Sequence, residues 1–371
     1  MTRAAPLPVV GATKTEWGLG MKVFLTGGTG FIGQALVRKI RERGWDLTVL
    51  LRDPKGAPAQ WIAKKGGTLV QGDVTRADGL EAAMAGADVV IHNAGVYEIG
   101  VDPATAARMQ AVNVQGTENV LGAACRARAP RTLHVSSIVA LGPSGFAPAP
   151  SVPADELKRH DGRCLTDYER TKVEAHQAAQ RWRADGLPLS IVMPNAVVGA
   201  NDHSDFGYFL RLTLLAGMGP VGFAPDAVYA LVDVDVLAEG VCLAAERARM
   251  GEDYLFCGEP QPLRALYDLW GRETRRMTPR VYVPRGVIRP LMALMEPLQR
   301  AAGLPAFMSR ELVDNSSAHW NYSSAKAERD LGWRHPAFAD MWPPIIARER
   351  ELMARRSGFV NKLRHQPVVE D

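Results

Sequence analysis

The sequence between positions 23 and 33 reads Val23-Phe24-Leu25-Thr26-Gly27-Gly28-Thr29-Gly30-Phe31-Ile32-Gly33. An apolar run rich in β-forming residues leads into glycines spaced by three, and a segment with helical periodicity follows. Gly27 allows a tight turn, Gly30 lets the backbone approach a pyrophosphate, and Gly33 lets the helix lie close against the strand. The amides at the helix start then face the phosphates. The stretch therefore predicts the strand, turn and helix that begin a dinucleotide-binding unit.

Short apolar segments alternate with helical segments through the first half of the chain. Helices are predicted at 31–43, 61–65, 77–85, 103–128 and 166–183, and further strands at 47–51, 68–71, 88–92, 131–135 and 189–193. This alternation predicts parallel β-α-β units with right-handed crossovers. The expected fold class is therefore α/β, with a doubly wound parallel sheet of the Rossmann type.

The chain has 371 residues, and its 47% hydrophobic and 23% charged residues are ordinary for a soluble globular protein. Its net charge of +4 gives no case for a nucleic-acid partner. The four cysteines form no C-x-x-C pair, so neither a metal site nor a disulfide framework is expected, and a reduced cytoplasm fits best. No apolar run is long enough to span a membrane, and residues 1–20 lack a signal-peptide pattern and are expected to be disordered.

The residue after the strand at 47–51 bears on the choice of cofactor. NAD-binding units usually carry an acidic residue there for the ribose 2′-hydroxyl, whereas an arginine accommodates the 2′-phosphate of NADP. Arg52 holds this position, with Lys55 nearby, and therefore favours NADP(H). Asp53 would serve the ribose of NAD if the strand ended one residue later, so NAD stays as the alternative.

Two further loops follow predicted strands at the edge where such sheets bind ligands. One loop holds Asp73 and Val74, and the Asp73 carboxylate either reaches the adenine edge or caps the next helix. The other holds the small residues Asn93, Ala94 and Gly95, which let the backbone pass close to a cofactor. Both loops are predicted cofactor-binding segments.

A serine, a tyrosine and a lysine form the predicted catalytic set. The strand at 131–135 ends in Ser136-Ser137, at the mouth of the cofactor crevice. Tyr168 and Lys172 stand four apart on a predicted helix and so share one face. A lysine ammonium stabilises a phenolate, which suits acid-base chemistry at neutral pH. The pair Tyr322 and Lys326 has the same spacing but follows no serine-ended strand, so it is interpreted as structural.

With these motifs assembled, the chain resembles the extended short-chain dehydrogenase/reductases. The stretch 26–33 looks like the family's T-G-x-x-G-x-x-G motif, and Ser137, Tyr168 and Lys172 match its catalytic triad. Asn113 matches the helix asparagine that holds a water in the family's proton relay. The resemblance assigns cofactor contacts to Thr26, Gly27, Gly28, Thr29, Gly30, Phe31, Ile32, Gly33, Arg52, Asp73, Val74, Asn93, Ala94, Gly95, Tyr168, Lys172, Pro194 and Asn195.

The resemblance also implies a domain plan. It places a dinucleotide-binding domain at 21–195 and a smaller, mostly helical substrate-binding region at 196–350, with residues 229–258 returning to the core and a tail at 351–371. Residues 286–302 could form an amphipathic helix. A homodimer through the helices at 103–128 and 166–183 is common in this family.

Arg52 favours the branch that resembles dihydroflavonol reductases and 3β-hydroxysteroid dehydrogenases. The expected activity is NADP(H)-dependent interconversion of a carbonyl and a secondary alcohol on a hydrophobic small molecule. The alternative is an NAD-dependent nucleotide-sugar epimerase or dehydratase. A non-catalytic nucleotide sensor is a third class, against which the intact Ser137, Tyr168 and Lys172 set argues.

Overall fold

The structure is a computed structural model that describes residues 20–98, 102–146, 152–217, 222–284, 286–290, 292, 294, 313–314, 318–358 and 362. The extension predicted at 1–20 falls almost wholly outside the described residues, as do most of the amphipathic segment predicted at 286–302 and the last part of the predicted tail. Within the described ranges, no helix is both long and apolar enough to cross a bilayer.

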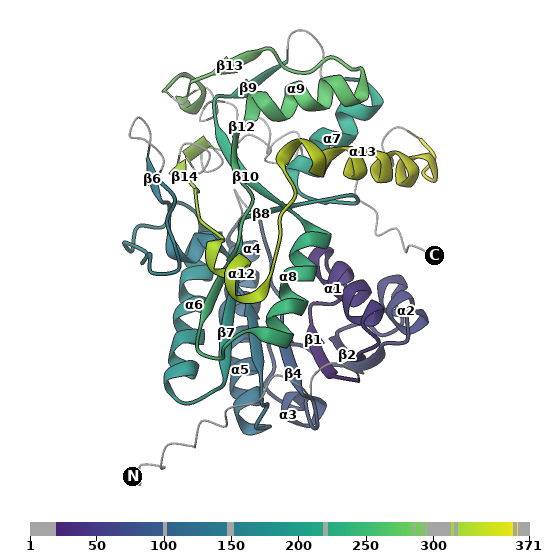
Figure 1. Cartoon of the computed structure of the whole chain (residues 1–371), viewed down its shortest axis with the longest axis vertical. Coiled ribbons are helices and arrows are strands. Elements are labelled where there is room, and N and C mark those ends of the chain that lie inside the picture. Colours follow the sequence, from purple (N-terminus) through teal and green to yellow (C-terminus); the bar gives the residue numbers. More distant parts are fainter. Residues whose placement is uncertain are drawn as a thin grey trace.

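A seven-stranded sheet forms the centre of the molecule, with the strand order β11-β7-β5-β4-β1-β2-β3 (Figure 1). Every neighbouring pair runs parallel. The strands are β1 (Lys22–Thr26), β2 (Asp46–Leu51), β3 (Thr68–Gln71), β4 (Val89–His92), β5 (Thr132–Val135), β7 (Leu189–Pro194) and β11 (Asp253–Phe256). The predicted α/β fold with a doubly wound sheet is confirmed. Because the strand order reverses between β1 and β4, a crevice is expected beyond their carboxyl ends.

Helices cover both faces of the sheet. One face carries α1 (Phe31–Glu42), α2 (Ala57–Lys64), α8 (Val234–Arg247) and α12 (Ala325–Leu331), and the other carries α3 (Leu80–Ala83), α4 (Pro103–Met109), α5 (Gly116–Arg126) and α6 (Asp167–Ala184). Alternate residues of a strand enter different cores: Val23 and Leu25 pack on the α1 side, and Phe24 packs on the α5 side. Each face of the sheet therefore has its own apolar core.

Two of the predicted helices differ in the structure. The helix predicted at 77–85 is only α3, because Gly79 adopts φ +78° and cannot continue a right-handed helix toward residue 77. The helix predicted at 103–128 ends at Arg126 and contains a π-helical turn, Gln110–Gln115, between α4 and α5. Such turns occur often at functional sites. This one contains Asn113.

A second lobe lies above the carboxyl edge of the sheet (Figure 1). It contains α7 (Asp205–Leu215), α9 (Leu263–Thr274) and α13 (Phe338–Ala354), together with the short strands β8 (Ala196–Val198), β9 (Phe223–Pro225), β10 (Val228–Asp233), β12 (Pro260–Pro262) and β13 (Val281–Val283). Its core includes Trp270 and Trp342, whose rings meet edge to face with centroids 5.1 Å apart. At its side, β6 (Gly145–Phe146) pairs with β14 (Ala318–His319), which joins the loop after β5 to the C-terminal part of the chain.

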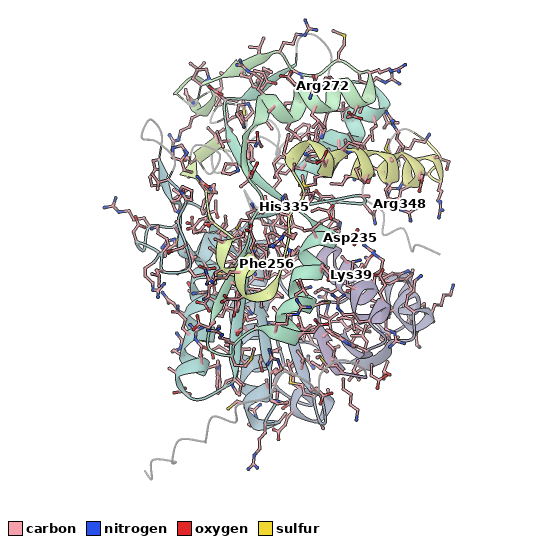
Figure 2. All side chains as sticks on the ribbon, in the orientation of Figure 1. Lys39, Asp235, Phe256, Arg272, His335 and Arg348 are labelled. Carbon is pink, nitrogen blue, oxygen red and sulfur yellow. The ribbon has the colours of Figure 1, made fainter. Side chains whose placement is uncertain are left out.

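The chain passes twice from this lobe back to the central sheet. α8 and β11 return first, and α12 follows with the segment that leads to α13. Trp333 fastens this segment, because its ring packs edge to face on Phe256 at 5.2 Å and its indole N–H donates to Val236 O at 3.0 Å. Figure 2 shows Phe256 in the lower body, Arg272 in the upper lobe and His335 between them.

Candidate active site

The glycine turn after β1 is shaped by contacts that exclude side chains. Gly27 adopts φ +73°, and a Cβ atom there would lie 2.7 Å from the Ala94 backbone. A Cβ atom on Gly33 would lie 2.0 Å from Gly27 O, so α1 packs directly on the turn. Gly30 differs, because its Cβ atom would meet only Gly27 O at 3.5 Å. The structure thus requires glycine at 27 and 33 for packing, and leaves Gly30 to be explained by a ligand.

The first turn of α1 fits an anion. Gly30 is the N-cap residue, no side chain caps the helix, and its first turn contains no acidic residue. The free amides and the positive end of the helix dipole are therefore not satisfied by a capping side chain and can bind an anionic ligand. The predicted pyrophosphate fits this helix start.

The residues after β2 and β3 lie at the same edge. Arg52 is exposed, and its side chain makes no ion pair within the described part of the chain. Asp53 instead turns into its own loop, where its carboxylate accepts from Lys55 N at 2.9 Å. Asp73 accepts from the backbone N and the hydroxyl of Thr75, both at 2.9 Å, within its own turn. It does not cap the next helix, because α3 begins at Leu80 with Gly79 as its N-cap residue and no side-chain cap. Its contact to adenine stays a prediction. Val74 is buried.

The loop after β4 is tied to the glycine turn. Asn93 Nδ2 donates to Gly27 O at 3.4 Å, and Ala94 N donates to the Thr26 hydroxyl at 3.2 Å. A Cβ atom on Gly95 would lie 3.4 Å from Lys172 Nζ. The predicted cofactor loops and the predicted catalytic lysine therefore meet at one place.

The predicted catalytic side chains also come together. Ser137 is the N-cap residue of the 3-10 turn Ile138–Leu141, and Tyr168 and Lys172 lie on successive turns of α6. The Ser137 hydroxyl lies near enough to the Tyr168 phenol to lower its pKa, and Lys172 Nζ lies 6.0 Å from the centre of the tyrosine ring. The sequence alone placed Ser137 after a strand and the other two residues on a helix, and the fold brings these two elements together.

Burial controls the ionisation of the pair. Although the Tyr168 ring is partly exposed, burial of its ionisable end raises the pKa to about 12, and the nearby Ser137 hydroxyl opposes this shift. Burial lowers the pKa of Lys172 to about 8. In the structure, burial and Ser137 account for the shifted pKa of Tyr168, and Lys172 does not contribute to it. The lowering of the phenol pKa that was expected from the lysine is therefore not seen in the protein without a cofactor.

Asn113 has a different set of partners from the water contact expected of it. Its Nδ2 donates to Val96 O at 2.9 Å and to the Thr171 hydroxyl at 3.0 Å, and its Oδ1 accepts from Val96 N at 2.7 Å. The side chain therefore clamps the loop after β4 beside Lys172. Its role in a proton relay stays a prediction.

Sequence reasoning missed Tyr97, which packs on the predicted catalytic tyrosine. Its ring meets the Tyr168 ring edge to face at 4.8 Å, and its side chain is 55% exposed. Its position in the loop after β4 was the signal available, since that loop was expected to pass the cofactor.

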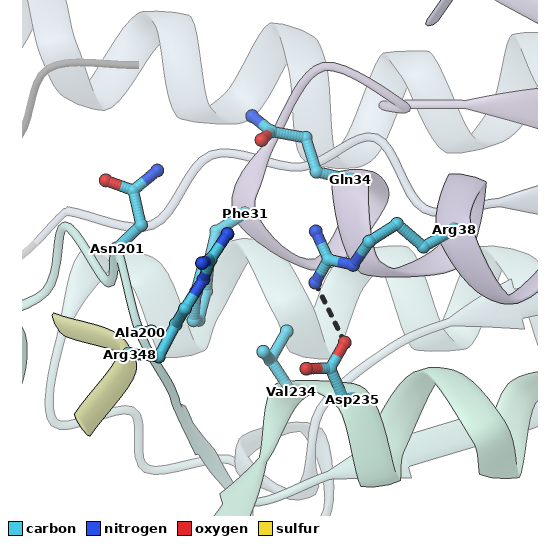
Figure 3. Close-up of a pocket in the computed structure, with 8 residues that line it drawn as sticks. All are labelled: Phe31, Gln34, Arg38, Ala200, Asn201, Val234, Asp235 and Arg348. Atoms are coloured by element: carbon cyan, nitrogen blue, oxygen red, sulfur yellow. Dashed lines mark hydrogen bonds and ion pairs between the residues drawn. The ribbon is translucent and has the colours of Figure 1, made fainter. Parts of the chain in front are cut away.

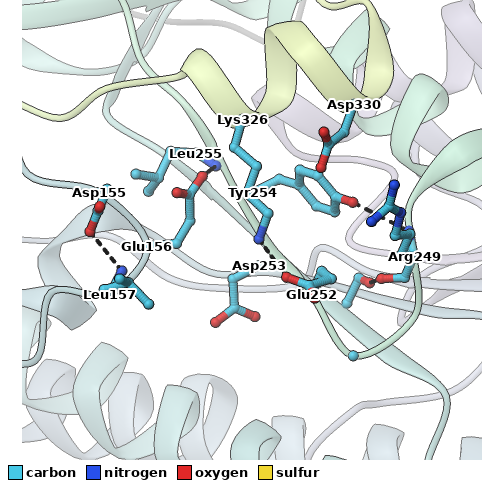
Figure 4. Close-up of polar contacts among 12 residues, drawn as sticks. Asp155, Glu156, Leu157, Arg249, Glu252, Asp253, Tyr254, Leu255, Lys326 and Asp330 are labelled. Atoms are coloured by element: carbon cyan, nitrogen blue, oxygen red, sulfur yellow. Dashed lines mark hydrogen bonds and ion pairs between the residues drawn. The ribbon is translucent and has the colours of Figure 1, made fainter.

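The second Tyr-x-x-x-Lys pair points apart, as its structural interpretation predicted. The Tyr322 hydroxyl donates to Gly142 O, whereas Lys326 pairs with Glu252 at 2.7 Å and lies over the Tyr254 ring (Figure 4). The first residue supports the loop after β5 and the second fastens α12 to the sheet edge. Neither interaction places a proton donor near Ser137.

Asn195 directly follows β7 at the same edge of the sheet. It is only 5% exposed, its Nδ2 donates to Gly258 O at 3.5 Å, and its Oδ1 is buried with no hydrogen-bond partner among the described residues. A buried acceptor without a partner is unfavourable, so it points to a donor from a ligand. The predicted contact of Pro194-Asn195 with a nicotinamide amide fits this position.

A separate cleft of about 240 Å³ lies beside α1 (Figure 3). The helix contributes Phe31, Gln34 and Arg38, and an ion pair of 2.8 Å joins Arg38 to Asp235 across it. Arg348 of α13 lines it from the second lobe. Neither Ser137 nor Tyr168 lines this cleft, so it is not the proton-transfer site.

Three histidines are buried next to the site without charge. Burial lowers the pKa of His92 to about 3 and of His176 to about 4, and it lowers that of His134 well below 6.5. The rings of His92 and His134 stack with centroids 5.3 Å apart. All three histidines therefore stay neutral in the folded protein at neutral pH.

Replacing His176 by glutamine is expected to flatten the loss of stability on acidification. The unfolded chain protonates this histidine below its ordinary pKa of 6.5, whereas the folded chain resists until about 4. Between these two pKa values the histidine lowers the free energy of unfolding by up to about 1.4 kcal/mol for each unit that the pH falls. Urea unfolding of parent and variant from pH 7 to 4 measures the difference. Equal slopes would show that His176 is protonated in the folded protein.

The comparisons with known proteins agree with this geometry. A sequence profile of the NAD dependent epimerase/dehydratase family matches residues 23–256, which include the glycine turn, Ser137, Tyr168 and Lys172. The chain belongs to the NAD dependent epimerase/dehydratase family. It is an NAD(P)-dependent oxidoreductase of the extended short-chain dehydrogenase/reductase type, as its resemblance implied.

Curated relatives in this family carry oxidoreductase names. A 4-hydroxy-2-methyl-3-oxo-4-farnesyl-3,4-dihydroquinoline-1-oxide ketoreductase of Stigmatella aurantiaca is 30% identical over 327 residues, covering 84% of this chain and 92% of the relative. A 3 beta-hydroxysteroid dehydrogenase/Delta 5-->4-isomerase of Mycobacterium tuberculosis is 28% identical over 331 residues, covering 84% of this chain and 85% of the relative.

Solved structures share the fold. The crystal structure of gox2253 has a TM-score of 0.74 at 31% identity, covering 89% of this chain and 98% of that one. The dTDP-glucose 4,6-dehydratase DesIV of Streptomyces venezuelae, solved with NAD and DAU, has a TM-score of 0.70 at 21% identity, covering 90% and 98%. At that identity the second likeness supports the fold alone.

Proposed function

We propose that the protein reduces a carbonyl, or oxidises the corresponding secondary alcohol, on a hydrophobic small molecule with NADP(H). The observation that carries this proposal is the meeting of Ser137, Tyr168 and Lys172 beside the loop after β4. A hydroxyl, a phenol and an ammonium at the mouth of a nucleotide crevice can bind and protonate a carbonyl oxygen.

The nicotinamide supplies hydride chemistry when bound. Ser137 would donate a hydrogen bond to the substrate oxygen and orient it. Tyr168 would give its proton to that oxygen as negative charge develops, and its raised pKa keeps the phenol protonated for this step. Lys172, whose pKa of about 8 leaves it largely charged at neutral pH, would stabilise the phenolate that remains. The arrangement therefore favours reduction.

NADP(H) is the proposed cofactor because Arg52 is exposed at the end of β2 while Asp53 is engaged by its own loop. Replacing Arg52 by aspartate is expected to raise the Kd for NADPH at least ~10-fold and to lower that for NADH. Lys64→Ala, at an exposed lysine of α2, is the control and should change neither dissociation constant by more than about 3-fold. Fluorescence titration measures all four constants. An Arg52 variant that still prefers NADPH would refute this role.

A hydrophobic substrate is proposed because the curated relatives are named for a farnesylated dihydroquinoline oxide and for 3β-hydroxysteroids. The partly exposed Tyr97 ring offers an aromatic wall beside Tyr168. A cytoplasmic location is proposed with this activity, since Cys125, Cys164, Cys242 and Cys257 are all unpaired. A homodimer stays a prediction.

The second candidate is a nucleotide-sugar epimerase or dehydratase, which the family description favours. The two functions differ in how they hold the cofactor. Denaturing the purified protein and identifying any nucleotide released tests them. An exchangeable site that prefers NADPH supports the reductase, whereas tightly retained NAD⁺ supports the second candidate.

A further inference from the structure

A continuous chain of buried hydrogen bonds links the glycine turn to the π-helical turn. Thr26 Oγ1 lies 2.8 Å from His92 Nδ1, and His92 Nε2 lies 3.1 Å from Thr117 Oγ1. The Thr117 hydroxyl donates to Asn113 O at 2.6 Å. The exposed fractions of Thr26, His92 and Thr117 do not exceed 1%, so water does not compete for these bonds.

The donor and acceptor of each hydrogen bond follow from the bond between Thr117 and Asn113 O. A carbonyl oxygen only accepts, so the Thr117 hydroxyl hydrogen is used on Asn113 O, and its oxygen must accept from His92 Nε2–H. A neutral imidazole then has a lone pair on Nδ1, which accepts from the Thr26 hydroxyl. The Thr26 oxygen in turn accepts from Ala94 N at 3.2 Å. His92 therefore carries its proton on Nε2.

The chain closes into a circuit through the loop after β4. Thr26 holds Ala94 N at one end of this loop, and the Asn113 side chain holds Val96 N and O at the other. Gly95 lies between the two clamps, where a Cβ atom would be 3.4 Å from Lys172 Nζ and 3.5 Å from Asn113 Oδ1. The circuit thus fixes the peptide that lies beside the lysine.

We propose that His92 is a positioning residue, which through its two ring nitrogens couples the glycine turn to the loop beneath Lys172. The inference rests on the proposed function, because the loops it couples are the proposed cofactor contacts. Thr26 contacts one nitrogen of the rigid imidazole ring and Thr117 contacts the other. A change at either threonine therefore alters the hydrogen bond that the ring makes with the other threonine. The surroundings keep the ring in place, since His134 stacks on it at 5.3 Å.

A double-mutant cycle between Thr26→Val and Thr117→Val in the full chain tests this coupling. Valine keeps the shape of threonine and removes the hydroxyl. Thr117 has no place in the proposed cofactor site, yet Thr117→Val is expected to raise the Kd for NADPH at least ~5-fold, and Thr117→Ser to restore it within about 2-fold. The double variant should bind about as weakly as the weaker single variant, because either change breaks the same circuit.

Thr213→Val is the matched control. Thr213 is also fully buried, and its hydroxyl makes the same bond to the carbonyl four residues earlier, Phe209 O, at 2.8 Å. It should lower the Tm much as Thr117→Val does and leave the Kd for NADPH unchanged. If Thr117→Val does not fold, His92→Asn serves in its place, since it keeps an acceptor for Thr26 and cannot reach Thr117.

The outcomes separate the inference from the proposed function. Two results would overturn the coupling. One is a double variant in which the fold-increases in the Kd for NADPH of the two single variants multiply, and the other is a Kd that Thr117→Val leaves unchanged. Failure of NADPH to bind the parent protein would instead overturn the proposed function.

Discussion

Replacing Tyr168 by phenylalanine should lower the turnover of ketone reduction about 10³-fold while the Kd for NADPH changes by less than about 3-fold. The phenol is the group placed to protonate the substrate oxygen, and phenylalanine keeps the ring that meets Tyr97. Only the hydroxyl beside Ser137 is lost. NADPH oxidation with a panel of hydrophobic ketones, together with a fluorescence titration of the cofactor, measures both quantities.

Tyr322→Phe is the matched control for this experiment. Tyr322 begins the other Tyr-x-x-x-Lys pair, and its hydroxyl bonds only the loop carbonyl Gly142 O among the contacts of the described chain. Its loss should lower the Tm and leave turnover within about 3-fold, because a buried hydrogen bond contributes about 1 kcal/mol to stability. Full turnover in Tyr168→Phe would remove the tyrosine from the mechanism.

Alanine at Gly33 and at Gly30 should fail in different ways. At Gly33 the new Cβ atom would lie 2.0 Å from Gly27 O. This clash is with a backbone atom, so it can be relieved only if the glycine turn itself moves. We expect poor folding, a Tm lowered by several degrees or more, and loss of NADPH binding. At Gly30 the Cβ atom fits the protein at 3.5 Å, so Gly30→Ala should fold normally and raise the Kd for NADPH at least ~10-fold.

Circular dichroism melts and cofactor titrations distinguish these two results. Gly286→Ala is the control, because Gly286 has no positive φ and nothing in the described part of the chain crowds the new Cβ within 4 Å. Undiminished NADPH binding by Gly30→Ala would place the pyrophosphate elsewhere than on this turn.

Much of the fold followed from local patterns in the sequence. Each strand of the central sheet that was predicted has an apolar run, and Gly27, Gly30 and Gly33 mark the first turn directly. The long helix at 103–126 was also predictable from its periodicity, but the π-helical turn within it was not. That turn contains Asn113, whose side chain clamps Val96, a contact between elements that the sequence does not encode locally.

The site could be predicted in part for the same reason. Tyr168 and Lys172 share a helix face, which spacing reveals, whereas Tyr97 reaches Tyr168 only through the path of its loop. His92 appeared as a strand-end histidine, and its partner Thr117 lies 25 positions away. Residues that act through long-range contacts carry no spacing signal.

Transfer of deuterium from NADPH that carries deuterium at both C4 positions of the dihydronicotinamide tests the central proposal most directly. With a hydrophobic ketone that the enzyme turns over, the proposal predicts deuterium on the carbinol carbon of the released alcohol, in a stoichiometry of one per NADP⁺ formed. A product that gains no label, made while NAD⁺ stays bound and the hydride returns to its own substrate, would contradict the proposal and favour the epimerase or dehydratase.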